Sequence, residues 1–238
     1  MGFFDRIKDS YDTIKYAKGK LDYLRQFPYL PDAGSFELVG KWMLCRDQTG
    51  NPLWYVTEGE KPFYVEQRTE GSNGREYAFV CSYFTDKKGD SDPRYVIARG
   101  TLDGLEAWFK VNEDFYSEYL TIGENKTALF FDEGNEKLHI IEPEGTHRTK
   151  TVGDYHDCAG NTEGFFWWVD NGDNIEVKGY AVTLSKSISK KVKAPNDEYE
   201  SLDTALCEDG IHIKFQHYED NTSIREFVCD FQGNVSEI

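Results

Sequence analysis

Residues 164–170, Gly-Phe-Phe-Trp-Trp-Val-Asp, contain four consecutive large aromatic side chains. Because successive residues of a β-strand point to opposite faces, Phe165 and Trp167 share one face of such a strand, and Phe166 and Trp168 share the other. Either protein covers both faces, as on the central strand of a layered fold, or one face is an exposed aromatic patch for a ligand or a partner. The stretch therefore predicts a β-strand, and we favour the covered arrangement.

Short strings rich in β-branched and aromatic residues continue on both sides of this stretch and alternate with turn residues. That pattern is typical of antiparallel hairpins. Hairpins are expected at 165–169 with 175–184, 76–84 with 94–99, 127–131 with 137–141, and 211–218 with 223–231. Segment 77–84 is apolar on both faces and predicts a central strand, whereas Ile211, Ile213 and Phe215 alternate with polar residues and predict one wet face. Four hairpins imply at least eight strands.

The chain divides into three parts. Residues 1–26 have apolar residues at helical spacing and predict an amphipathic helix, residues 27–35 predict a proline-containing linker, and residues 36–238 predict a β-rich globular domain. Within that domain, one medium helix is expected from about Leu105 to Leu120 and a short one from Tyr199 to Leu206. The predicted fold is mainly β, an antiparallel sandwich or barrel with peripheral helices; the alternative is a small β-propeller.

Composition limits the possible functions. The 238 residues include 27 Lys plus Arg against 43 Asp plus Glu, a formal net charge of −16, and 15% aromatic residues. An aromatic-rich chain can bury a core, and the negative charge disfavours nucleic acid as a partner. No apolar run is long enough to span a bilayer, so no membrane partner is expected. Five widely spaced cysteines without a Cys-x-x-Cys pair fit free thiols in a reducing, cytoplasmic setting.

Aromatic residues next to acids are the candidate binding residues: Phe165, Trp167, Trp168, Trp54 and Glu163. An indole face can stack on a sugar ring, and a pair of carboxyl groups can hydrolyse a glycosidic bond. These residues therefore allow a carbohydrate-binding or glycoside-hydrolysing protein. The simpler interpretation is that the aromatic side chains form the core and the acids coat the surface.

A second candidate is the reactive group around 154–158. His156 and Cys158, with His147, could bind a soft divalent metal, although their spacing matches no established zinc motif. A plain loop with a solvated histidine is the alternative that we favour. The sequence also lacks a phosphate-binding P-loop, a dinucleotide fingerprint, a nucleophile elbow and a His-Glu-x-x-His motif, so no cofactor is predicted.

The acidic charge leads to the main functional hypothesis, a non-catalytic binding module that recognises a basic protein partner. A protein of this kind acts as an inhibitor or immunity-type protein that masks its target. Carboxylates on its surface would speed capture of the partner, and central aromatic residues would anchor the complex. The oligomeric state does not follow from the sequence.

Overall fold

The computed structural model describes residues 15, 18, 19, 22–30, 33–57, 61–112 and 114–238. Nineteen β-strands make up nearly all the regular structure of these ranges, where helical backbone is confined to 15, 18, 19 and 22–24. The predicted helix at 1–26 lies mostly outside the described residues. No helix in the described part of the chain is long and apolar enough to cross a membrane.

The chain separates into two compact units. Unit 1 comprises residues 1–68 and 79–113, and unit 2 comprises residues 69–78 and 114–238. Whether residues 36–238 behave as one domain stays a prediction.

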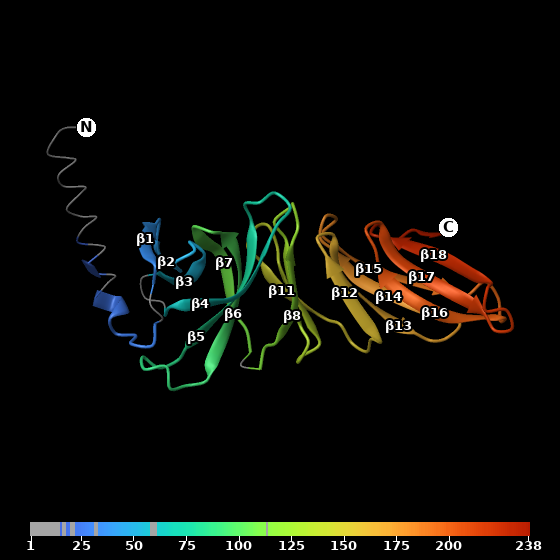
Figure 1. The fold of residues 1–238 in the computed structure, drawn as a ribbon, viewed down its shortest axis with the longest axis horizontal. Coiled ribbons are helices and arrows are strands. Elements are labelled where there is room, and N and C mark those ends of the chain that lie inside the picture. The colour runs from blue at the N-terminus through green and yellow to red at the C-terminus, as the bar shows by residue number, and fades with distance from the viewer. Residues whose placement is uncertain (1–14, 16–17, 20–21, 31–32, 58–60, 113) are drawn as a thin grey trace. The chain divides into compact units, whose positions relative to one another are not determined.

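A seven-stranded antiparallel sheet forms the main part of unit 1, with its strands in sequence order (Figure 1). They are β1 (Ser35–Val39), β2 (Trp42–Arg46), β3 (Pro52–Thr57), β4 (Phe63–Glu70), β5 (Tyr77–Phe84), β6 (Pro93–Thr101) and β7 (Gly104–Lys110). Strand β5 is buried on both faces from Tyr77 to Ser82, which confirms the prediction of a central strand. Leu24, near the end of the segment predicted as a helix, packs with Met43 and Trp54 in an apolar cluster on this sheet.

Three four-stranded antiparallel sheets make up most of unit 2, each a meander of consecutive strands. The first sheet contains β8 (Ser117–Ile122), β9 (Ala128–Asp132), β10 (Lys137–Ile141) and β11 (His147–Thr151). The second contains β12 (Asp157–Asn161), β13 (Gly164–Asp170), β14 (Asn174–Ala181) and β15 (Lys186–Lys193). The third contains β16 (Tyr199–Leu206), β17 (Gly210–His217), β18 (Ile224–Asp230) and β19 (Val235–Glu237).

The aromatic run lies on β13 and is covered on both faces. Phe165 and Trp167 pack with Phe131 and other residues of the first sheet, whereas Phe166 and Trp168 pack with Ile213 and other residues of the third. None of the four is more than 5% exposed. The second sheet is thus a middle layer with two apolar faces, and the aromatic run is part of the core, as in the arrangement that we favoured.

The four predicted hairpins are present as β5–β6, β9–β10, β13–β14 and β17–β18. The one wet face predicted for 211–218 is also confirmed, since Ile211, Ile213 and Phe215 are buried and the residues between them are partly exposed. A mainly β fold of at least eight antiparallel strands is therefore confirmed.

The two predicted peripheral helices are wrong. Residues 105–110 lie in β7, 117–120 lie in β8, and 199–206 form β16. Each of these strands contains a β-bulge, near Glu106, Glu118 and Leu202 respectively. A bulge inserts one extra residue, so the spacing between inward-facing residues changes locally from two to three. Such spacing imitates one turn of an amphipathic helix.

Candidate functional site

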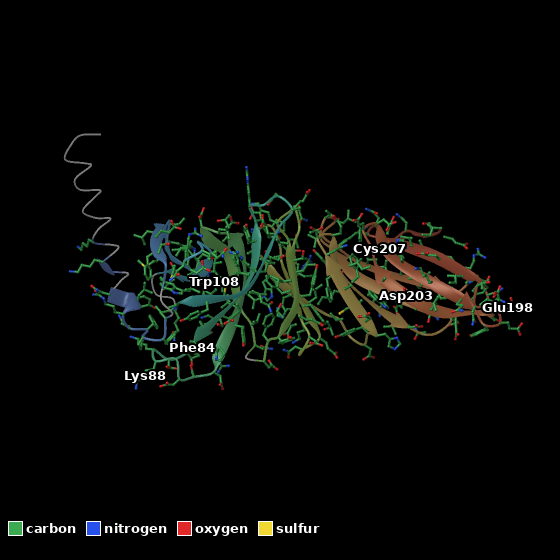
Figure 2. All side chains as sticks on the ribbon, viewed as in Figure 1. Phe84, Lys88, Trp108, Glu198, Asp203 and Cys207 are labelled. Atoms are coloured by element: carbon green, nitrogen blue, oxygen red, sulfur yellow. The ribbon has the colours of Figure 1, made fainter. Side chains whose placement is uncertain are left out.

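A pocket of about 360 Å³ lies in unit 2, where strand β12 of the second sheet comes near strand β16 of the third. Both strands are at the edge of their sheets. We call it the acidic pocket, because its lining contains three aspartates and neither lysine nor arginine. Its main residues are His156, Asp157, Trp168, Asp170, Leu202 and Asp203. Asp203 can be located on β16 in Figure 2.

Strand pairing positions the residues on the second sheet. Asp157 of β12 stands opposite Trp168 of β13 in register, so both side chains lie on the same face of the sheet. That face is the one that packs on the third sheet. Trp168 consequently contributes an apolar wall to the acidic pocket, although only 5% of the residue is exposed.

The bulge in β16 shapes the opposite wall. The register shifts between Ser201 and Asp203, which leaves Leu202 as the extra residue. Side chains of successive residues alternate in a regular strand, but a bulge re-aims them. As a result, Leu202, Asp203 and Thr204 all line the pocket, and Leu202 is 47% exposed.

Hydrogen bonds fix the Asp170 side chain in the lining of the pocket. Its Oδ1 atom accepts from the backbone N–H of Gly172 at 2.7 Å, and its Oδ2 atom accepts from the hydroxyl of Ser201. The backbone N–H of Ser201 also donates to the carbonyl of Gly172 at 3.0 Å. The turn after β13 is thereby tied to β16, and the carboxylate is held in place before any ligand binds.

His156 is oriented by the same segment. Its Nδ1 atom accepts from the backbone N–H of Asp170 at 2.8 Å. An Nδ1 acceptor requires the proton of the neutral ring to be on Nε2, so the exposed imidazole offers an N–H donor at that atom. The acidic pocket therefore combines three carboxylates, one imidazole and the apolar surfaces of Trp168 and Leu202.

The predicted binding residues are only partly brought together. Trp168 lines the acidic pocket, but Phe165, Trp167 and Trp54 are each 1% exposed and lie in apolar clusters. Glu163 accepts from the hydroxyl of Thr183 at 2.9 Å in a turn and does not line the pocket. The covered faces leave no open indole platform at Trp54, Trp167 or Trp168.

The candidate metal ligands are not brought together. The described residues contain no group of three His, Cys, Asp or Glu side chains that could hold a metal ion. His147 faces His139 across β10 and β11, with 3.1 Å between its Nε2 atom and Nδ1 of His139. Cys158 packs against the apolar cluster between the first and second sheets. Its burial there raises the pKa of the thiol to about 12, so it is unsuited to act as a thiolate.

Sequence reasoning missed Asp170, Leu202 and Asp203 as site residues. Asp170 belongs to the turn Asp-Asn-Gly-Asp-Asn, whose composition signals a hairpin and hides any other role. Leu202 and Asp203 are more than thirty residues away in the sequence and were assigned to a helix. Only the packing of the third sheet on the second brings them to Trp168.

Comparison with known proteins identifies no family. No family model matches the chain, and no curated protein matches it. Among solved structures, it is similar to a protein of unknown function from Bacteroides caccae, with 10% identity, a TM-score of 0.34, and coverage of 83% of this chain and 74% of that one. Virginiamycin B lyase from Staphylococcus aureus has 13% identity, a TM-score of 0.33, and coverage of 85% and 82%. A putative 6-phosphogluconolactonase from Bacteroides fragilis has 11% identity, a TM-score of 0.37, and coverage of 87% and 69%.

Proposed function

We propose that the protein is a non-catalytic binding module whose acidic pocket receives a lysine or arginine side chain of a basic protein partner. The observation that carries the proposal is the placement of Asp157, Asp170 and Asp203 around Trp168. A long cationic side chain has an apolar stem and a charged head. The apolar walls would contact the stem, and the carboxylates would pair with the head.

Charge and rigidity both support this function. The formal net charge of −16 attracts a basic partner from a distance and raises its association rate, an effect that salt weakens. Asp170 is already oriented by hydrogen bonds, so less freedom is lost on binding. The exposed Leu202 adds apolar area at the rim of the pocket.

A defined peptide pair tests the proposal. Binding of an arginine-rich peptide and of its citrulline twin is measured by calorimetry at low and moderate salt. We expect the arginine peptide to bind and its twin to bind at least about tenfold more weakly, because the neutral twin cannot pair with the carboxylates. Equal binding of the two peptides, or binding that does not weaken with salt, contradicts the proposal.

Matched charge variants separate the acidic pocket from the general acidic surface. Asp157→Asn with Asp203→Asn removes two charges from the pocket, and Glu144→Gln with Glu219→Gln removes two from exposed positions elsewhere in unit 2. The first pair should lose most of the affinity and the second should keep it. Equal losses would show that net charge alone attracts the peptide.

The alternative, a carbohydrate-binding or glycoside-hydrolysing protein, has less support. Sugar stacking needs an open aromatic face, and Trp54, Trp167 and Trp168 are at most 5% exposed. A panel of oligosaccharides and chromogenic glycosides tests it. Quenching of tryptophan fluorescence by a glycan would favour this alternative over the peptide-binding function.

We also infer that the fold of unit 2 is closer to a small β-propeller, the alternative predicted from the sequence, than to a β-sandwich. Its three sheets are four-stranded meanders of consecutive strands, and the middle one is covered on both faces. Successive blades of a propeller are four-stranded sheets of this kind. An experimental structure of residues 114–238 tests this assignment.

A further inference from the structure

A second pocket of about 270 Å³ lies on the opposite face of the second sheet, and its charge is reversed. Strand β11 of the first sheet contributes Arg148, Thr149 and Lys150, and the β14–β15 hairpin contributes Tyr180, Ser185 and Ser187. We call it the basic pocket. Its lining residues include no aspartate or glutamate, in a protein with a formal net charge of −16.

Strand register explains why the basic groups gather there. Arg148 and Lys150 are two residues apart on β11 and stand opposite Ile140 and Leu138 of β10. Ile140 and Leu138 face the apolar cluster between the first and second sheets, so the two cations lie at the border of that cluster. On the second sheet, Tyr180 stands opposite Ser187, which places both on the same face.

Arg148 is held over the pocket by two contacts. Its Nη2 atom donates to the hydroxyl of Tyr180 at 3.0 Å, and the same guanidinium pairs with Glu142. Tyr180 is 2% exposed, so its hydroxyl is a fixed anchor. A guanidinium has five N–H donors, and these two partners leave donors for a ligand.

Lys150 differs from the other cations nearby. Lys178 pairs with Glu176 at 3.2 Å and Arg148 pairs with Glu142, whereas Lys150 has no carboxylate within 4.0 Å among the described residues. Its ammonium lies 5.3 Å from the centre of the Trp167 ring. Burial, followed by the neighbouring Lys178, lowers the pKa of Lys150. A half-buried cation without a counter-ion is costly unless an anion binds beside it.

The geometry points to a binding site for the phosphoryl group of a small phosphate monoester in the basic pocket, with Lys150 and Arg148 as its charged ligands. A tetrahedral phosphoryl group has oxygens that face several directions. It can accept from Lys150 on β11 and from the hydroxyl of Ser187 on β15 at once. A planar carboxylate has two oxygens and uses fewer of these donors. The volume is enough for a small molecule only.

This site is independent of the proposed function. The acidic pocket contains Trp168 and lies on the face toward the third sheet, whereas the basic pocket adjoins Trp167 on the face toward the first sheet. The aromatic run thus contributes one tryptophan to each side of the middle layer. Binding at either pocket can fail without affecting the other.

Calorimetry of the full chain with inorganic phosphate, phenyl phosphate and benzoate tests the inference. Phenyl phosphate and benzoate share the ring and differ in the anionic group. We expect both phosphates to bind at millimolar concentrations or below. Benzoate should bind at least about tenfold more weakly than phenyl phosphate, a difference in binding free energy of about 1.4 kcal/mol. Absence of phosphate binding, or benzoate binding equal to that of phenyl phosphate, overturns the inference.

Three variants locate the site. Lys150→Met keeps an unbranched apolar chain without the ammonium and should weaken phenyl phosphate binding about tenfold or more, while Lys88→Met in an exposed turn of unit 1 should leave it unchanged. Glu142→Gln should strengthen binding, because it removes the carboxylate that competes for Arg148. Circular dichroism spectra and urea midpoints check that each variant is folded. Loss of affinity in Lys88→Met equal to that in Lys150→Met, or weaker binding by folded Glu142→Gln, contradicts the inference.

Discussion

The Nδ1 atom of His139 lies 3.1 Å from the Nε2 atom of His147, so the two imidazoles form one hydrogen-bonded pair. Only one of these two nitrogens can carry the shared proton. His139 is 7% exposed, and its Nε2 atom lies 3.7 Å from Asp132, too far for a hydrogen bond. Burial, followed by the neighbouring His147, lowers the pKa of His139 to about 4.

The first prediction concerns stability in acid. His139 has a lower pKa in the folded chain than the ordinary 6.5, so the unfolded chain binds the extra proton first. Its contribution to stability is present above pH 6.5 and is lost as the pH falls from about 6.5 to about 4. Each unit of pKa difference corresponds to about 1.4 kcal/mol. His139→Gln should flatten the decrease in unfolding free energy across this range, measured by urea denaturation. An unchanged dependence of the unfolding free energy on pH in His139→Gln would contradict the prediction.

The second prediction has the opposite sign and provides the control for the first. His212 lies between two carboxylates, with Nδ1 at 2.7 Å from Glu226 and Nε2 at 2.7 Å from Asp209. These hydrogen bonds, that to Glu226 first, raise the pKa of His212. Its contribution is present below pH 6.5 and is lost as the pH rises through the higher folded pKa. His212→Gln should therefore cost more stability at pH 6 than at pH 9, and the reverse order would refute the assignment.

The third prediction tests the packing of β8 on β12. A Cβ atom on Gly160 would lie 2.0 Å from Cζ of Tyr119, and the Tyr119 hydroxyl donates to the carbonyl of Asn161 at 2.8 Å. Gly160→Ala should destabilise the protein by about 1–3 kcal/mol, because the ring must move. In the Tyr119→Ala background the same change should cost less, and the difference is the coupling energy of a double-mutant cycle. Equal costs in the two backgrounds would show that the ring is not the obstacle.

The fourth prediction concerns thiol reactivity. Cys45, Cys81 and Cys229 are 0% exposed, whereas Cys158 and Cys207 are half-buried. Burial raises the pKa of Cys158 to about 12, so few of its thiols are ionised at neutral pH. Cys207, which lies at the end of β16 in Figure 2, should react fastest with a chromogenic disulfide in the native protein, and all five should react in urea. Cys207→Ser should remove the fast phase, and its persistence would place the reactive thiol elsewhere.

Sequence patterns found the hairpins and failed at the bulged strands. The hairpin from 211 to 231 has regular alternation on its first strand, so its period of two is visible without the fold. In β16 the extra residue Leu202 interrupts the alternation, and the pattern resembles a helix. Whether a strand has a bulge depends on its pairing partner, which the local sequence does not contain.

The candidate site was predictable only through Trp168, His156 and Asp157. All three belong to segments that we singled out for their composition, and all three line the acidic pocket. Their relation to Leu202 and Asp203 depends on how the third sheet packs on the second. Local patterns carry no information about such long-range packing.

The order of residues alone determined a β-rich chain with a strongly aromatic strand at 165–169, because alternation and turn chemistry are local properties of the backbone. It also determined the excess of negative charge. The tertiary structure decided that Trp167 and Trp168 lie on opposite sides of a middle sheet, one beside the ammonium of Lys150 and the other beside carboxylates. Lys150 belongs to the first sheet and Asp203 to the third, so only the packing of whole sheets brings these two charged groups to the tryptophans.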